Sequence, residues 1–61
     1  MIVIKDDHGR NFKISNLEKF KNHLKKYHSN NGKGDNSLHE EDGFWFHVTE
    51  DFYYKIMSME D

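Results

Sequence analysis

Cysteine and proline are both absent from this 61-residue sequence. Without cysteine the chain cannot form a disulfide, a thiolate zinc site or a thiol nucleophile, although disulfides and zinc are common supports of very short domains. The remaining means of stabilising so short a domain are good packing, a metal ion held by histidine or carboxylate, and self-association. Because a chain of about 60 residues buries only about 60% of its unfolded surface, we expect a single domain over residues 1–61 with a thin core.

Long hydrophobic runs are absent as well. The sequence contains no stretch of about 18 apolar residues, no signal-peptide pattern and no lipidation motif, which predicts a cytoplasmic protein that does not enter a membrane. Hydrophobic residues make up only 34% of the chain, but five phenylalanines, three tyrosines and one tryptophan are among them. Each aromatic side chain buries on the order of 150–250 Å², so a few of them can close a small core.

The charge is divided between the two halves of the chain. The net charge is −2, but residues 1–33 carry eight Lys or Arg against three acids, giving +5, whereas residues 34–61 carry one Lys against eight acids, giving −7. Such a division is typical of a protein with a charged partner. It also arises when the two halves of one domain, or two copies of it, attract each other.

Two short segments near the N-terminus alternate apolar and polar residues with the period of a half-buried strand. Residues 2–5 and 11–14 flank the tripeptide 7–9, and Gly9 suits the left-handed position of a three-residue hairpin loop. This loop gives the pairs Ile2 with Ile14 and Ile4 with Phe12. Both apolar pairs then lie on one face, so the sequence predicts an antiparallel hairpin.

The segment after this hairpin has the pattern of an amphipathic helix over about residues 16–28. Ser15 and Glu18 form a capping box, in which the Ser15 hydroxyl accepts a hydrogen bond from the backbone amide of Glu18. Apolar residues follow at the spacing of a single stripe, which we expect to pack on the sheet. The stripe consists of Leu17, Phe20, Leu24 and Tyr27.

Residues 29–37 contain no apolar side chain and are interrupted by Gly32 and Gly34. We expect the helix to end at Asn31 or Gly32 and the rest to form a flexible polar loop. The Gly-Lys-Gly sequence within it lacks the spacing of a phosphate-binding loop, and no strand precedes it.

Residues 38–48 indicate a second hairpin with two alternative turns. A three-residue loop over 41–43 pairs Leu38 with Phe46 on the core face, whereas a two-residue Asp42-Gly43 turn moves Leu38 to the opposite face. We expect the three-residue loop, because it keeps the apolar residues on one face. The opposite face then carries Val3, Lys13, His39, Trp45 and His47.

Thr49 is a suitable N-cap for a short helix over about residues 50–58, since Glu50 and Asp51 follow in the first turn, where the helix dipole favours acids. The expected packing face of this helix consists of Phe52, Tyr53, Ile56 and Met57. The fold class predicted is therefore α+β in the order ββαββα. Two hairpins form a mostly antiparallel sheet, on which the first helix packs.

Five histidines in so short a chain raise the question of a metal site. They are His8, His23, His28, His39 and His47. No two are spaced as in His-x-x-x-His or His-Glu-x-x-His, and the five-residue spacing of His23 and His28 places their side chains on different faces of a continuous helix. We therefore expect no metal site and no cofactor, and histidine-based metal binding is kept as the second alternative function.

No catalytic arrangement is visible in the sequence. Cysteine is absent, and the serines lie at a predicted cap, in the polar loop and near the C-terminus. A catalytic pair needs a concave site of the usual 300 Å³ or more, which so short a chain has little material to build. We expect a protein that is not an enzyme.

The surplus of aromatic residues favours a protein-binding module as the leading hypothesis. Trp and Tyr are enriched where interfaces concentrate their binding energy, provided that the last helix does not cover Trp45. The predicted contact residues are Trp45, His47, Val3, Tyr53 and Tyr54. The partner would be another protein or a second copy of the chain, and the size resembles that of small accessory, adaptor or inhibitor proteins of bacteria, phages and mobile elements.

Nucleic-acid binding through the basic helix over residues 17–28 is the first alternative. Lysine side chains on its surface and on the adjoining strand could neutralise phosphates. These residues are Lys13, Lys19, Lys21, Lys25 and Lys26. A single arginine and the acidic total charge argue against this function.

Overall fold

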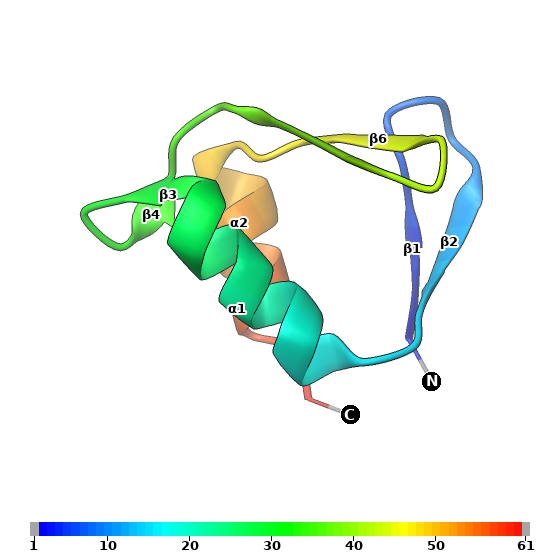
Figure 1. Cartoon of the computed structure of the whole chain (residues 1–61), viewed down its shortest axis with the longest axis horizontal. Coiled ribbons are helices and arrows are strands. Elements are labelled where there is room, and N and C mark those ends of the chain that lie inside the picture. Colours follow the sequence, from blue (N-terminus) through cyan, green and yellow to red (C-terminus); the bar gives the residue numbers. More distant parts are fainter. Residues whose placement is uncertain (1, 61) are drawn as a thin grey trace.

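Short strands and two helices alternate along the computed structural model, which describes residues 2–60 (Figure 1). The elements are β1 (Ile2–Lys5), β2 (Asn11–Ile14), α1 (Leu17–Tyr27), β3 (Ser29–Asn30), β4 (Lys33–Gly34), β5 (Leu38–Glu41), β6 (Phe44–His47) and α2 (Glu50–Met57). The predicted α+β class and the order of its main elements are confirmed. The strands do not form one sheet, however, but three separate antiparallel pairs, β1–β2, β3–β4 and β5–β6.

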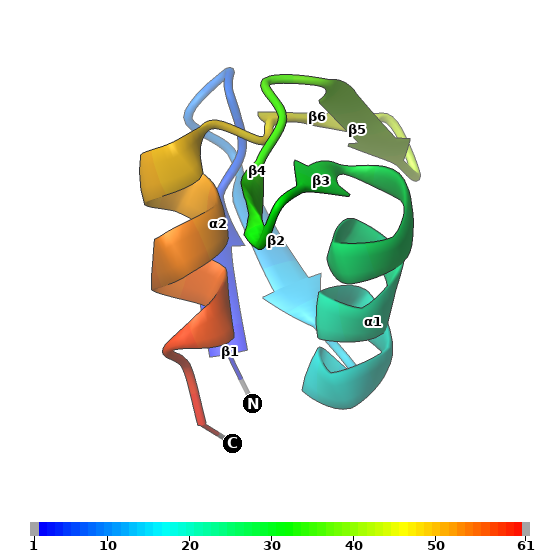
Figure 2. The same ribbon diagram turned by 90° about the vertical axis from the view of Figure 1, so that its left-hand side faces the viewer.

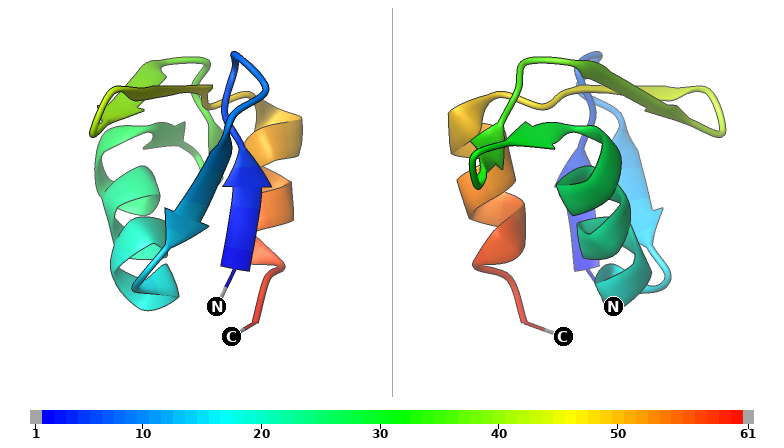
Figure 3. Two further views of the ribbon diagram at one scale, coloured as in Figure 1. Left: turned by 90° about the vertical axis from the view of Figure 1, so that its right-hand side faces the viewer. Right: turned by 60° about the vertical axis from the view of Figure 1, so that its left-hand side comes forward.

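The three strand pairs and the two helices enclose a single core. Figure 1 shows β5 and β6 running across one end of the molecule, with the β1–β2 hairpin along one side. In the left view of Figure 3 this hairpin lies in front of the gap between α1 and α2, and Figure 2 shows the β3–β4 ribbon between the upper ends of the helices. The buried apolar residues are Ile4, Phe12, Ile14, Leu17, Phe20, Leu24, Phe46, Val48, Tyr53 and Ile56.

The first hairpin has the predicted register. Ile2 pairs with Ile14 and Ile4 with Phe12, and Gly9 has the expected left-handed backbone with φ 77°. The backbone amide of Asp6 donates to the carbonyl of Arg10 at 2.9 Å, which closes the three-residue loop. Local turn chemistry and the apolar face agree here, so the sequence alone determines the pairing.

A buried carboxylate joins this hairpin to β6. The side chain of Asp6 accepts hydrogen bonds from the backbone amide of Arg10 at 2.8 Å, from its guanidinium at 2.7 Å and from the amide of Trp45 at 3.4 Å. Arg10 also donates to the carbonyl of Gly43 at 2.6 Å. Burial acts to raise the pKa of Asp6, but the hydrogen bonds from Arg10, Trp45 and His8 outweigh it and lower the pKa from 3.8 to about 2.

We expect Asp6→Asn to flatten the acid limb of the stability profile. The folded-state pKa of Asp6 is below its unfolded value, so its charge stabilises the native state above about pH 4, and this contribution is lost as the pH falls through 2. Urea unfolding of wild type and variant between pH 2 and pH 6 checks this. Two profiles of equal slope would contradict it, and Asp7→Asn, one residue along the chain, is the matched control.

The second hairpin has the two-residue turn, so the expected three-residue loop over 41–43 was wrong. Asp42 and Gly43 both adopt left-handed backbone, with φ 52° and 82°, as a tight hairpin turn requires. Glu41 therefore pairs with Phe44, His39 with Phe46 and Leu38 with His47. A shift of one residue exchanges the two faces of a strand. Leu38 is consequently 47% exposed, and His39, which we placed on the outer face, is only 4% exposed.

The N-terminus of α1 is capped by Asn16 and not by Ser15. The Asn16 side chain accepts a hydrogen bond from the backbone amide of Lys19 at 3.0 Å. A cap one residue later than predicted keeps the helix itself within the expected bounds. Three of the four stripe residues are buried as expected, but Tyr27 is 59% exposed. It occupies the last helical position, and its ring packs against His23 with the centroids 4.9 Å apart.

The polar segment 29–37 contains a short ribbon where the sequence predicted only a loop. The helix ends at Tyr27, and Asn31 and Gly32 form the turn between β3 and β4 with left-handed backbone, φ 54° and 77°. Gly34 is buried against α2, and a Cβ at this position would lie 2.3 Å from the carbonyl oxygen of Thr49. The two-residue strands are too short for a periodic pattern to reveal them.

The C-terminal helix agrees with the prediction in its cap and its packing face. The Thr49 hydroxyl accepts from the backbone amide of Phe52 at 3.1 Å. Tyr53 and Ile56 are 7% and 0% exposed, and Phe52 and Met57 pack against the core at its edge. Among residues 2–60, neither helix is long and apolar enough to cross a membrane.

Candidate metal centre

Three of the five histidines meet at one end of the core. His23 lies on α1, His28 directly follows that helix, and His39 lies on β5. One ring nitrogen from each lies within 4.8 Å of those of the other two. The ring centroids of His28 and His39 are 5.1 Å apart, and those of His23 and His39 are 4.7 Å apart. The expectation that the side chains of His23 and His28 lie on different faces was therefore wrong.

The end of α1 brings His23 and His28 together. The prediction treated them as members of one continuous helix, in which a five-residue spacing separates side chains by more than a quarter of a turn. The backbone of His28 has left the helix, however, with φ −129° and ψ 23°, while its amide still donates to the carbonyl of Leu24 at 2.9 Å. The helical wheel therefore does not apply to His28, and its ring lies 5.3 Å from that of His23.

The tight turn of the second hairpin brings in His39. Because its register directs the side chain inward, the imidazole packs against the rings of Phe20 and Phe46, with centroids 5.5 and 6.1 Å away. The three rings differ in exposure, since His39 is buried, His28 is half-buried and His23 is exposed. His39 is thus held by the core, whereas His23 lies at the surface.

A chain of polar contacts runs through His28 and His39. The inner nitrogens, Nε2 of His28 and Nδ1 of His39, are 3.2 Å apart. On the outer side, Nε2 of His39 is 3.0 Å from a carboxylate oxygen of Glu41, and Nδ1 of His28 is 2.6 Å from the hydroxyl of Ser37. The Ser37 hydroxyl in turn donates to Asp35 at 2.5 Å. Each ring therefore has its outer nitrogen held by an oxygen.

The oxygen partners of the two rings favour one placement of the ring protons. Ser37 donates its hydrogen to Asp35, so it accepts one from Nδ1 of His28, and the carboxylate of Glu41 accepts one from Nε2 of His39. In the neutral rings the two inner nitrogens then carry only lone pairs. Two lone pairs 3.2 Å apart repel each other unless a proton or a metal ion lies between them.

The surroundings favour the neutral imidazoles that a metal ion needs. Desolvation lowers the pKa of His28, and the neighbouring His39 and His23 lower it further, against a smaller opposing effect of Asp35. Desolvation and His39 likewise lower the pKa of His23, with Glu41 acting in the opposite direction. Since a ligating imidazole must be unprotonated, these shifts keep lone pairs available at neutral pH.

The spacing of the inner nitrogens suits a tetrahedral ion. Two imidazole nitrogens at about 2.0–2.1 Å from zinc, at a tetrahedral angle, lie roughly 3.3–3.4 Å apart. The observed separation between His28 and His39 is 3.2 Å. A ring nitrogen of His23 also lies within 4.8 Å of a ring nitrogen of each of the other two histidines, so His23 can supply a third ligand. His8 and His47 are not part of this cluster.

The predicted protein-binding residues lie on separate elements. Trp45 is 40% exposed and Val3 is 50% exposed, so α2 does not cover Trp45. Tyr54 on α2 is 75% exposed, but Tyr53 is buried in the core and is not available as a surface contact. In the observed register the outer face of β5 and β6 gains Leu38 and Glu40 and loses His39. It carries Leu38, Glu40, Trp45 and His47.

The lysines of α1 border different grooves. Lys19 lines a groove together with residues of β2, whereas Lys21 and Lys25 line another together with residues of α2. The Lys21 ammonium donates to the carbonyl of Met59 at 2.5 Å, and Lys13 is on β2. Binding of nucleic acid through these lysines stays a prediction.

The Asp42-Gly43 dipeptide was the sequence feature that could have revealed the site. It is a strong indication of a two-residue hairpin turn, and that turn alone directs His39 and Glu41 to the inner face.

Comparison of the chain with protein-family models, with curated proteins and with solved structures gave no match. The function is therefore interpreted from the geometry of the site.

Proposed function

We propose that this protein binds a divalent transition-metal ion, with zinc as the best fit, through His23, His28 and His39. One observation carries the proposal: the inner nitrogens of His28 and His39 converge at 3.2 Å while the outer nitrogen of each is held by an oxygen. Metal-ligating histidines almost always donate a hydrogen bond from the N–H of their second ring nitrogen to a carboxylate, a carbonyl or water. Glu41 takes this role for His39, and Ser37 with Asp35 takes it for His28.

The ligand set selects the kind of metal. Imidazole suits zinc, copper, nickel and cobalt, whereas magnesium and calcium prefer oxygen ligands. Zinc accepts three histidines with a fourth position left for water or another ligand. A bound ion would connect the end of α1 to β5, since His23 and His28 belong to the first and His39 to the second.

A thermal-melting titration tests the proposal. Zinc in a hundredfold excess over its dissociation constant stabilises the folded state by about 2.7 kcal/mol, which raises the melting temperature of so small a domain by on the order of 10 °C. We expect this rise with zinc, its loss on adding EDTA, and no effect of magnesium.

Two matched variants locate the metal. His28→Ala should lose the zinc-dependent rise, whereas His8→Ala, which removes a histidine outside the cluster, should keep it. If zinc stabilises neither the wild type nor the His8 variant, the chain has no metal site of this kind. If zinc stabilises the His28 variant as much as the wild type, it binds elsewhere.

Protein binding through the outer face of β5 and β6 is a second proposal, favoured by two neighbouring apolar side chains that are exposed. Leu38 is 47% and Trp45 is 40% exposed, and Trp is the residue most enriched at interface hot spots. A second copy of the chain is the expected partner, since the charges of its two halves are opposite. The molar mass in solution checks this, and a monomer at high protein concentration would count against it.

A further inference from the structure

The outer edge of β6 is already occupied. In an antiparallel pair, alternate residues direct their backbone groups toward the partner strand and away from it, and Trp45 and His47 direct theirs away from β5. The carbonyl of Trp45 accepts from the amide of Asp7 at 2.7 Å, and its amide donates to the Asp6 side chain at 3.4 Å. The amide of His47 donates to the Asp7 side chain at 3.2 Å, and its carbonyl accepts from the amide of Thr49 at 2.9 Å. Every outward backbone group of this edge therefore has a partner.

The outer edge of β5 is open. Leu38 and Glu40 pair with His47 and Trp45, so their own backbone groups also point away from the hairpin. Figure 2 shows β5 on the outer side of this strand pair, and within residues 2–60 only β6 pairs with it. In the same part of the chain, no hydrogen bond reaches the outward amides and carbonyls of Leu38 and Glu40. This edge can therefore accept a further strand.

The edge of β5 is also less protected than the edges of the first hairpin. Edge strands of natural proteins often carry lysine, which opposes pairing with another chain. Lys5 and Lys13 lie at outward-bonding positions of β1 and β2, one on each edge. The strand β5 contains no lysine, and Leu38 adds an exposed apolar side chain.

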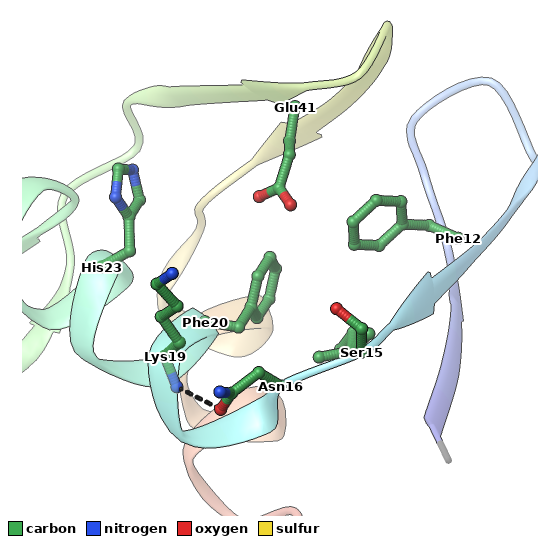
Figure 4. Close-up of a pocket in the computed structure, with 8 residues that line it drawn as sticks. Phe12, Ser15, Asn16, Lys19, Phe20, His23 and Glu41 are labelled. Carbon is green, nitrogen blue, oxygen red and sulfur yellow. Dashed lines mark hydrogen bonds between the residues drawn. The ribbon is translucent and has the colours of Figure 1, made fainter.

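The two acids of β5 are held by groups of their own chain. The carboxylate of Glu40 accepts a hydrogen bond from the backbone amide of Gly43 at 2.8 Å, which holds its charge close to the turn. Figure 4 shows the side chain of Glu41 directed to the inner side of the hairpin, toward Phe20. Neither carboxylate therefore blocks the approach of a strand to the edge of β5.

We infer that β5 pairs antiparallel with β5 of a second copy of the chain, so that the two hairpins form one continuous sheet. With the two-fold axis at His39, each Leu38 exchanges two backbone hydrogen bonds with Glu40 of the other copy, and every outward group of both strands is paired. An axis at Leu38 or Glu40 pairs only half of these groups, and the latter also places two like charges opposite each other. The inference rests on the second proposal, because it specifies how two copies associate.

The same register covers exposed apolar surface. The two Leu38 side chains lie on the outer face as diagonal neighbours across the axis, about 7–8 Å apart, which is within reach of long side chains. Trp45 lies beside Glu40 in its own hairpin, in the row that continues to Leu38 of the second copy. The exposed apolar residues of this hairpin are thus brought together by pairing at the edge.

Sedimentation equilibrium of the full chain tests the inference, with EDTA present so that no metal ion bridges two copies. We expect the wild type to form a dimer. A synthetic chain with an N-methyl group on the amide nitrogen of Glu40 loses two hydrogen bonds per dimer, so its dissociation constant should rise about tenfold or more. N-methylation of Lys13, an outward amide of β2, is the matched control and should leave the constant unchanged.

Two variants of Leu38 test the register. Leu38→Lys places a positive charge opposite Glu40 of the second copy, whereas Leu38→Glu places two acids opposite each other. The dimer of the lysine variant should therefore dissociate about tenfold less readily than that of the glutamate variant. Val3→Lys and Val3→Glu make the same changes in net charge at an exposed residue of the first hairpin, and their dissociation constants should be equal.

The results separate this inference from the proposal on which it rests. A dimer that N-methylation of Glu40 does not weaken, or equal dissociation constants for the two Leu38 variants, overturns pairing through β5 and leaves protein binding through the outer face intact. A wild-type chain that stays monomeric at high protein concentration overturns both.

Discussion

His39→Leu is expected to lower the affinity for zinc by more than about 100-fold while the metal-free protein stays folded. Loss of a residue that only supports a metal ligand typically costs 10–100-fold in affinity, and His39 would be a ligand itself. Its imidazole is 4% exposed and packs against Phe20 and Phe46, so leucine fills an apolar site. Because leucine has no polar group to satisfy there, we expect the free energy of unfolding of the metal-free variant to change by less than about 1.5 kcal/mol.

The measurement is zinc affinity by competition with a chelating dye, alongside urea unfolding of the metal-free protein. His47→Leu is the matched control, because His47 lies on the outer face of the same hairpin and pairs with Leu38. It should bind zinc as the wild type does. Equal zinc affinities for all three proteins would show that His39 is a core residue with no ligand role.

Gly34→Ala is expected to destabilise the protein by about 3 kcal/mol. A Cβ at this position would lie 2.3 Å from the carbonyl oxygen of Thr49 and 2.7 Å from that of Val48. Both atoms belong to the backbone, so β4 and the start of α2 must move apart, and overpacking of this kind costs about 1–3 kcal/mol or more. A domain of 61 residues has a total stability of only about 3–9 kcal/mol.

Urea unfolding measures this effect as a fall in the midpoint at unchanged slope. Lys33→Ala, the preceding and exposed residue of β4, is the control and should shift the midpoint little. A midpoint for the Gly34 variant equal to that of the control would mean that β4 and α2 are not packed so closely. The ribbon of β3 and β4 would then have to be independent of the rest of the core.

Local sequence patterns were sufficient to predict the structure where two independent signals agreed. In the first hairpin, the loop containing Gly9 and the apolar pairs Ile2–Ile14 and Ile4–Phe12 demand the same register. The two helices were likewise predicted from a capping residue and an apolar stripe, although the cap of α1 is Asn16 and not Ser15. At helix ends such competition between neighbouring polar residues depends on backbone angles that the sequence does not display.

The register of the second hairpin was predicted wrongly because two sequence signals conflicted. The Asp42-Gly43 turn required one register, and the apolar character of Leu38 favoured the other. The turn determines the register because the hydrogen-bond partners of the buried His39 are available in that register. His28 lies eleven residues earlier in the chain, and Glu41 lies on the inner face with His39 only when the turn has two residues. Since strands have a period of two, this one error moved every side chain of β5 and concealed the histidine cluster.

The position of His28 and His39 at the two ends of one segment gives a bound ion a second consequence. Between them lie the β3–β4 ribbon and residues 35–37, so a metal ion held by both would act as a reversible cross-link around a loop of about twelve residues. In a disulfide, closing a loop of that size contributes about 3 kcal/mol through the unfolded chain. A protein without cysteine would thereby have a cross-link that forms or is lost as the metal concentration changes.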